Sequence, residues 1–336
     1  MPAGPSAATA AGIPSMRSVP TRTARTLADV LDLVAAGPVA PDHDEGGDGV
    51  PGTLRAVLDD AARRACRVGG WTGDDPLRLS KGPVTWLLRC PRRALAGADA
   101  AASDDMVVGL AVDAAAKLAT LAPRHPVTVE AVLGYLAASG DTSVRDHLDD
   151  LGAAAAPLLA DIEARVQRLV AAWPAIDPAW WPRVEEPVRV RLAGGAVVVS
   201  GRLDLLLGGP PTDRPAVVVE VKAGRWHDGM RADGHLYALL VSLRDGRPPA
   251  AIVTVVADGT TQVEPVRPAV LETAADRVEQ ALAVAAPIAA GEPPAARPGP
   301  HCTHCPVRPG CGAGRDWRPA HPDLAGGRAG HLVSGP

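Results

Sequence analysis

The sequence has few aromatic residues and few lysines. It contains no phenylalanine, two tyrosines and seven tryptophans in 336 residues, although 47% of its residues are hydrophobic. Its core must therefore be built mainly from aliphatic side chains. Lysine occurs only at Lys81, Lys117 and Lys222, and arginine supplies the other basic positions. Heavy use of Ala, Arg, Gly, Pro and Val indicates GC-rich coding, so each lysine is more informative than an arginine.

Membrane and secretion signals are also missing. No uninterrupted apolar stretch reaches the roughly 18 residues that a membrane span needs. Residues 1–25 are rich in Ala, Pro, Ser and Thr and have no apolar segment, so we expect no signal peptide. The five cysteines are odd in number and gather near one end, unlike a secreted disulfide framework. These features predict a cytoplasmic protein without membrane contact.

The net charge of -4 and the pI near 6.1 argue mildly against a dedicated nucleic-acid-binding protein. They do not exclude a nuclease, because an acidic metal site and local arginine patches can offset each other.

Hydrophobic periodicity divides the chain into three regions. We predict a flexible tail and a helical accessory region over residues 1–76, a main domain over 77–315, and a flexible tail over 316–336. Helices are expected at 26–36, 53–68, 80–89, 105–121, 128–138, 143–172, 228–243 and 269–290. Strands are expected at 188–192, 196–207, 216–222, 251–257 and 261–266. This order predicts an α/β domain whose central mixed β-sheet is flanked by helices.

Two acidic residues occupy adjacent predicted strands that a Gly/Pro-rich loop connects. If Leu207 pairs with Val217 across that loop, the antiparallel register places Asp204 opposite Glu220. Like charges at such positions destabilise a sheet unless a cation compensates them. A hard divalent ion such as Mg²⁺ or Mn²⁺ is the simplest candidate.

Lys222 lies two residues after Glu220, so its side chain emerges on the same face of the strand. A metal ion polarises a phosphate oxygen and activates water, and a lysine can orient or deprotonate that water or stabilise the developing charge. The group therefore has the chemistry of phosphodiester hydrolysis. A surface salt bridge between Glu220 and Lys222 is the alternative, which the neighbouring valines disfavour.

These residues resemble the PD-(D/E)XK nuclease superfamily. Asp204 follows Gly201-Arg202-Leu203, as in RecB-like members, and Glu220 and Lys222 match the Glu-x-Lys motif. The resemblance implies a catalytic role for Tyr237 in the next helix, where the family has Gln-x-x-x-Tyr; here Asp233 replaces the glutamine. An ordinary core tyrosine is an equally good interpretation of Tyr237.

The family also carries a histidine on an upstream helix, four residues after a glycine. Here Gly109 is followed by Asp113. The resemblance implies that Asp113, Asp204 and Glu220 bind the Mg²⁺ or Mn²⁺ ion, because carboxylate oxygens suit such ions. A solvated helix residue is the alternative for Asp113.

Three cysteines, Cys302, Cys305 and Cys311, fall within a span of ten residues inside a Pro/Gly-rich segment. This spacing in a cytosolic protein indicates a metal site that needs a fourth ligand. The candidates are Cys66, Cys90, His301 and His304.

The pattern is similar to the iron-sulfur branch of the same superfamily, which includes CRISPR-adaptation nucleases and the AddB type. That resemblance covers residues 77–315 and implies that Cys90 joins the three C-terminal cysteines around a [4Fe–4S] cluster. Zn²⁺ is the alternative, because four thiolates suit it equally well. Cys66 lies outside this set.

The resemblance implies a metal-dependent deoxyribonuclease, an exonuclease or an enzyme directed to single strands or ends. DNA repair, recombination and phage defence all fit, with a helicase or another repair or defence protein as a partner. Arg89, Arg92 and Arg93 beside Cys90 are candidate phosphate contacts, or a solvated basic helix end. The remaining alternatives are a non-catalytic DNA-binding or scaffold subunit that retains the fold, and a zinc-ribbon interaction module.

Overall fold

A computed structural model describes residues 26–36, 49–95 and 103–317. The tail expected at residues 1–23 lies outside the described residues, as does the tail from residue 316 apart from Asp316 and Trp317. Most of the loop expected between the first two helices also lies outside them. Within the described part of the chain, no helix is both long and apolar enough to cross a lipid bilayer.

A six-stranded mixed sheet forms the centre of the protein, which confirms the predicted fold class. Its strands are β1 (Leu77–Leu79), β2 (Arg183–Leu192), β3 (Val197–Leu207), β4 (Val217–Lys222), β5 (Ala251–Val256) and β6 (Thr261–Pro265). The strand order is β1-β3-β4-β5-β6, and β2 also pairs with β3. Only β1–β3 and β4–β5 are parallel.

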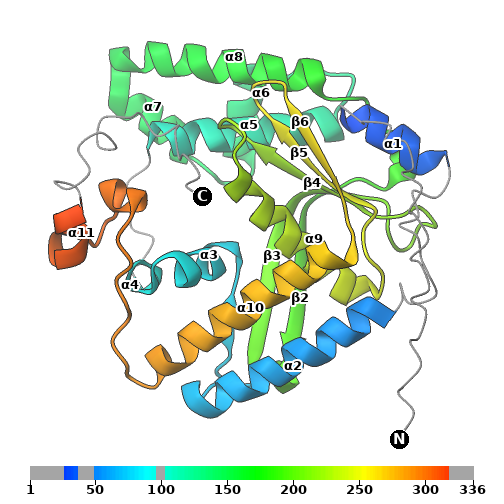
Figure 1. Ribbon diagram of the computed structural model, residues 1–336. Coiled ribbons are helices and arrows are strands. Elements are labelled where there is room, and N and C mark those ends of the chain that lie inside the picture. The colour runs from blue at the N-terminus through cyan, green and yellow to red at the C-terminus, as the bar shows by residue number, and fades with distance from the viewer. Residues whose placement is uncertain (1–25, 37–48, 96–102, 318–336) are drawn as a thin grey trace, which may run out of the picture.

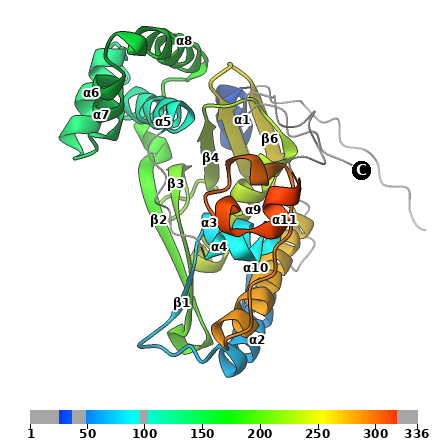
Figure 2. The same ribbon diagram turned by 90° about the vertical axis from the view of Figure 1, so that its left-hand side faces the viewer.

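Helices cover both faces of this sheet (Figure 1). They are α1 (Leu27–Ala35), α2 (Gly49–Gly69), α3 (Lys81–Arg89), α4 (Pro91–Ala94), α5 (Asp104–Leu121), α6 (Val129–Ala138), α7 (Ser143–Leu151), α8 (Ala156–Ala172), α9 (Arg231–Asp245), α10 (Pro268–Ala289) and α11 (Gly312–Trp317). One core cluster joins α1 and α5–α8 to the sheet. The other joins α2, α3, α9 and α10 to the opposite face. The turned view separates these two layers (Figure 2).

The helices α2 and α10 show why these segments are helical and where they pack. In α2, Leu54, Leu58, Ala61, Ala62 and Ala65 recur every three or four residues and form one buried stripe. A matching stripe on α10 faces the same core cluster. Small alanines let the two helices approach closely without aromatic side chains. The helix α2 thus shares its core with the sheet, although it precedes the boundary expected at residue 77.

The segment expected to be one helix over residues 143–172 is interrupted. Gly152 has a φ of +53°, a short 3₁₀ turn follows, and α8 then begins with Pro157 in its first turn. Glycine tolerates the positive φ and proline cannot supply a helical N–H, so the break has a local cause. Ser80 is the N-cap of α3 as expected, but its side chain makes no capping hydrogen bond with the described helix.

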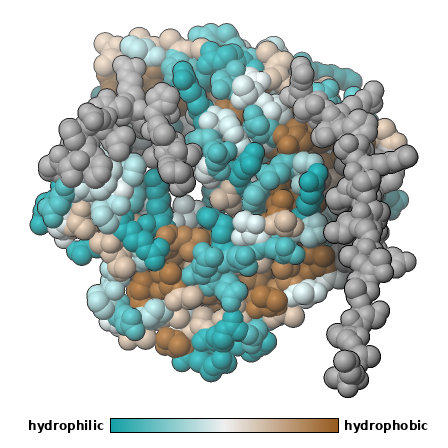
Figure 3. Space-filling view, in the orientation of Figure 1, coloured by the Kyte–Doolittle hydropathy of each residue, from teal (hydrophilic) through white to brown (hydrophobic). Residues whose placement is uncertain are grey.

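The surface seen in Figure 3 shows hydrophobic residues in small, separate patches among hydrophilic ones.

Candidate active site

The candidate site lies where β3 and β4 separate. The ladder pairs Leu207 with Val217, as predicted, and ends at Leu205 with Val219. Asp204 and Glu220 are the next two residues, and in the described sheet they are not a ladder pair. Instead, the Asp204 carboxylate accepts a hydrogen bond from the backbone N–H of Val221 at 2.7 Å. A side chain thus replaces a backbone partner at the point where the strands diverge.

The same point interrupts the pairing of β3 with β2. Val184 pairs with Leu205 and Glu186 with Leu203, so the register places Glu185 opposite Asp204, but these two are not paired in the described ladder. Glu185 has a φ of +53°, a conformation that is costly for a non-glycine residue. The buried faces also change here: Leu203 faces one core cluster, whereas Leu205 faces the other. This irregularity aims acidic side chains from two strands at one region.

Glu220 is the most deeply buried acidic group of the site, with 1% of its side chain exposed. Its Oε2 atom lies 2.7 Å from Lys222 Nζ. Its Oε1 atom is buried and has no hydrogen-bond partner in the described part of the chain. Burial, and then the charge of Asp204, raise the pKa of Glu220 to about 7, although Lys222 and Lys81 act in the opposite direction.

Lys222 lies between two acidic groups. Besides Glu220, its ammonium lies 3.3 Å from the Asp233 carboxylate. Burial alone lowers the pKa of Lys222, but Glu220, Asp233 and Asp204 together raise it above its ordinary value. Lys222 is therefore firmly cationic at neutral pH.

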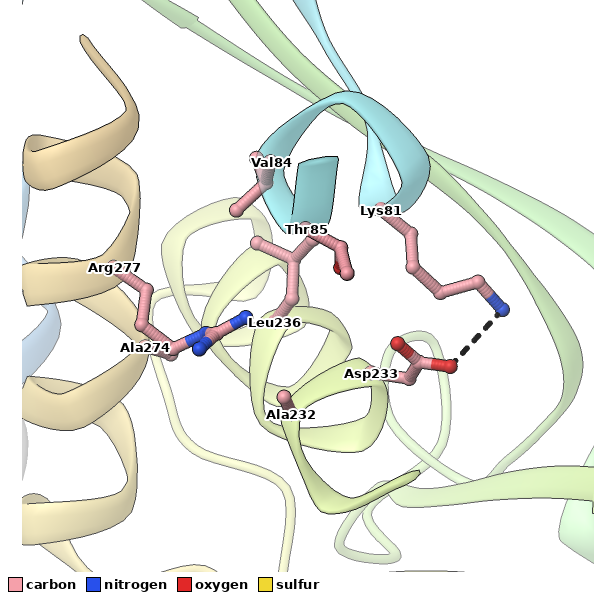
Figure 4. A pocket seen from close by; sticks show the side chains of 8 residues that line it. All are labelled: Lys81, Val84, Thr85, Ala232, Asp233, Leu236, Ala274 and Arg277. Carbon is pink, nitrogen blue, oxygen red and sulfur yellow. Dashed lines mark ion pairs between the residues drawn. The ribbon is translucent and has the colours of Figure 1, made fainter. Parts of the chain in front are cut away.

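Asp233 also forms an ion pair with a second lysine. Lys81 at the start of α3 points toward Asp233 across a small pocket, with 3.4 Å between Lys81 Nζ and Asp233 Oδ2 (Figure 4). Arg277 reaches the same pocket from α10. Asp233 thus connects α3 to Lys222.

Tyr237 is 4% exposed and packs in the core cluster beside α3. A Cβ atom at Gly201 would overlap the Tyr237 ring, so only glycine allows this approach of α9 to β3. Lys81 Nζ lies 5.6 Å from the ring centroid. Burial, and then the charges of Glu220 and Asp204, raise the pKa of Tyr237.

Asp113 points toward this cluster from α5. Its Oδ2 atom forms an ion pair with Lys117, and its Oδ1 atom is buried without a partner among the described residues. Burial, and then the charge of Asp204, raise the pKa of Asp113 to about 6, so Asp204 lies near enough to affect both Asp113 and Glu220. Lys117 also binds Glu185. Asp113 is therefore a partly buried member of the acidic cluster.

The donor set fits a hard divalent cation. In Asp113 and in Glu220, one carboxylate oxygen contacts a lysine, and the second is buried and has no partner in the part of the chain that the structure describes. Free carboxylate oxygens are the ligands that Mg²⁺ and Mn²⁺ prefer. However, no group of three or more His, Cys, Asp or Glu side chains is already placed to hold a metal ion in residues 26–36, 49–95 and 103–317. Lysines, rather than a closed coordination shell, neutralise the carboxylates in this structure.

Three members of this site were not expected from the sequence: Lys81, Lys117 and Glu185. The rarity of lysine was a usable signal, because all three lysines of the chain contact this acidic cluster. Glu185 gave no such signal, since its position depends on the pairing of β2 with β3.

The four predicted cluster ligands, Cys90, Cys302, Cys305 and Cys311, line a single cavity. Cys90 ends α3, and the other three lie in the segment that leads to α11, which Figures 1 and 2 show beside α3 and α4. Cys66 lies elsewhere, on α2 beside the core, where burial raises the pKa of its thiol. Four thiols are the donor set of either an iron-sulfur cluster or Zn²⁺, but among the described residues no three of them are already placed to hold a metal ion.

Hydrogen bonds also join the two segments that carry these cysteines. The Arg92 backbone N–H donates to Ala295 O at 3.1 Å, and its guanidinium donates to Gly310 O at 2.8 Å. Arg297 donates to Leu88 O at 2.6 Å. Arg92 therefore links the segment that carries Cys90 to the segment that carries the other three cysteines.

The other two arginines of this segment lie against an aromatic ring. The guanidinium carbons of Arg89 and Arg93 lie 5.6 and 5.0 Å from the centroid of Trp86. The edge of that ring meets His301 at a centroid distance of 5.7 Å.

Comparisons with known proteins support a nuclease fold. A family model described as the PD-(D/E)XK nuclease superfamily matches residues 78–312, more than half of the chain. No curated protein sequence matches. Among solved structures, SSO0001 is 16% identical with a TM-score of 0.30, covering 70% of this chain and 86% of that one. A presumptive exonuclease from Eubacterium rectale is 12% identical with a TM-score of 0.41, covering 65% and 84%. At these scores the structural likeness says nothing about activity, whereas the family match is decisive: the chain belongs to the PD-(D/E)XK nuclease superfamily.

Proposed function

We propose that this protein is a divalent-metal-dependent nuclease that hydrolyses phosphodiester bonds in DNA. Asp204, Glu220 and Lys222 form its catalytic group, and Asp113 supplies a further metal ligand. One observation carries the proposal: near Asp204, Glu220 and Asp113 each present a buried oxygen that has no hydrogen-bond partner among the described residues. Such oxygens are costly unless a cation or a proton satisfies them.

Mg²⁺ or Mn²⁺ bound there would polarise the phosphate and activate a water molecule. Lys222 keeps its proton because its acidic neighbours raise its pKa. Its role is therefore to hold the phosphate or the water and to stabilise negative charge, rather than to act as a base. Tyr237 and Asp233 fix the surroundings of Lys222 from α9.

The cavity lined by four cysteines supports a [4Fe–4S] cluster as a second, structural cofactor, with Zn²⁺ as the alternative. Anaerobic purification followed by metal analysis and an absorption spectrum separates the two. A brown protein with about four iron atoms per chain supports the cluster. A colourless protein with one zinc atom per chain supports Zn²⁺ instead.

Single strands or DNA ends are the proposed substrate class, and a helicase or a defence or repair protein in the cytoplasm is the proposed partner. The cationic face formed by Arg89 and Arg93 on Trp86 supports contacts with phosphates. Arg92 contributes less, because its guanidinium already binds Gly310.

A cleavage assay tests this proposal. Labelled single-stranded, duplex and flapped DNA are incubated with and without Mn²⁺, using the wild-type protein and Glu220→Ala. We expect Mn²⁺-dependent cleavage by the wild type alone. Binding of DNA without cleavage in any metal would instead support a non-catalytic subunit that retains the fold.

A further inference from the structure

Different lysines contact the carboxylates at the two ends of the site. Lys222 and Lys81 lie at Glu220 and Asp233. Lys117 lies at the other end, where it forms ion pairs with both Asp113 and Glu185. Asp204 lies near enough to both ends that its charge raises the pKa of Asp113 and of Glu220.

Lys117 is an unusual lysine, because only 11% of its side chain is exposed. Burial alone disfavours its charge, yet the hydrogen bonds and charges of Asp113 and Glu185 keep its pKa above the ordinary value. The ammonium of Lys117 is therefore a fixed positive charge, buried between two carboxylates that come from different elements, α5 and β2.

Glu185 is held in place for this contact. It projects from β2 at a φ of +53°, opposite Asp204, and Arg202 binds the same carboxylate from β3. A conformation this costly persists only when surrounding contacts compensate it. Lys117 and Arg202 supply those contacts.

Asp113 connects this arrangement to the proposed metal. Its Oδ2 atom binds Lys117, while its buried Oδ1 atom has no partner among the described residues. A carboxylate that offers one oxygen to each of two cations is the bridging ligand of a two-metal site. Here one of the two cations is an ammonium.

We infer that Lys117 occupies the position of a second divalent cation, between Asp113 and Glu185, and so restricts this nuclease site to one metal ion. The inference rests on the proposed function, because it requires a first metal at Asp113, Asp204 and Glu220. It assigns Lys117 and Glu185 as positioning residues for that metal.

The test counts Mn²⁺ ions bound per chain, from the electron paramagnetic resonance signal of free Mn²⁺ during titration of the full-length protein. We expect one ion for the wild type and two for Lys117→Met, which keeps the length of the side chain without its charge. Lys117→Arg, the matched control, should bind one. Adding Glu185→Gln to Lys117→Met should return the number to one.

A single ion in Lys117→Met, bound as tightly as in the wild type, overturns the inference. If Lys117→Met is unfolded without metal, millimolar Mn²⁺ must restore its native circular dichroism; a chain that stays unfolded in Mn²⁺ also overturns it. A wild type that binds no Mn²⁺ contradicts the proposed function itself, so the two failures are distinguishable.

Discussion

The carboxylate site and the cysteine cavity bring distant residues together in different ways. Asp204 and Glu220 lie where β3 and β4 separate, and Lys222 forms an ion pair with Glu220 within the protein. The cysteines lie at the end of α3 and in the segment that leads to α11. The sheet thus brings the residues of the first site together, whereas the second site depends on contacts between α3, α4 and the C-terminal segment. A metal should therefore be required for activity at the first site and should mainly stabilise the fold at the second.

Removing the catalytic groups should produce the largest effect and leave the fold intact. Glu220→Ala and Lys222→Ala should each reduce cleavage by on the order of 10²–10³, because each removes charge stabilisation at the reacting phosphate. Single-turnover cleavage rates and circular dichroism measure the two consequences. Glu272→Ala, on the exposed side of α10, is the control and should cleave as the wild type does. Undiminished cleavage by either variant would show that the site is elsewhere.

Removing a cysteine ligand should have the opposite pattern. Cys90→Ser and Cys302→Ser should lose the bound metal or cluster and lower the Tm by about 3 °C or more, since about 2 kcal/mol corresponds to roughly that shift in a chain of this size. Cys66→Ser should keep both properties, because that thiol lies on α2. Metal analysis and thermal unfolding provide the readouts. Loss of metal in Cys66→Ser with full retention in Cys90→Ser would show that Cys66, and not Cys90, is the fourth ligand.

The carboxylate site should also respond to pH. Glu220 and Asp113 have folded-state pKa values raised to about 7 and about 6, against about 4 in an unfolded chain. The stability that these protons contribute to the metal-free protein is fully present below about pH 4 and is lost as the pH rises through 6 and 7. Binding of Mn²⁺ requires the ionised carboxylates, so the Tm increase caused by Mn²⁺ should be small at pH 5.5 and large at pH 8. An increase independent of pH would place the ion elsewhere.

Asp113 gives a smaller and more specific effect. If Asp113 binds the metal, Asp113→Asn should raise the Mn²⁺ concentration needed for half-maximal cleavage, and Asp113→His should preserve part of the activity. Titrations that match the wild type in both variants would make Asp113 only a partner of Lys117.

The smallest expected effect tests how β3 and α9 fit together. A methyl group at Gly201 would overlap the Tyr237 ring, so Gly201→Ala should destabilise the protein by about 1–3 kcal/mol. Gly134→Ala is the matched control, because a Cβ there meets nothing within 4 Å and lies in helix α6. It should be neutral or stabilise the helix by up to about 1 kcal/mol. Urea unfolding measures both, and equal stabilities would show that Tyr237 moves aside freely.

The sequence predicted the features that depend on local pattern. The loop between β3 and β4 fixed the register that brings Asp204 near Glu220, and the helix carrying Asp113 was expected almost residue for residue. Strand β1 was missed because its three residues are too short to show alternation. Glu185 was missed because only the long-range pairing of β2 with β3 brings it to Asp204. The roles of the catalytic and cysteine residues remain predictions.

The hydrogen bonds between α3, α4 and residues 295–310 hold the end of α3 that lies away from Lys81. The helix α3 carries Lys81 at its first residue, while its last turn is held by Arg297, and the adjoining α4 is held by Ala295 and Gly310. A ribosome-bound chain that ends before residue 295 lacks all of these partners. The last turn of α3 and the helix α4 then lose these contacts, whereas Lys81 is still held by β1 and by the core that α3 shares with α9 and α10. A chain shortened before residue 295 should therefore keep Lys81 beside Asp233 and lose the arrangement of Cys90 and Arg92.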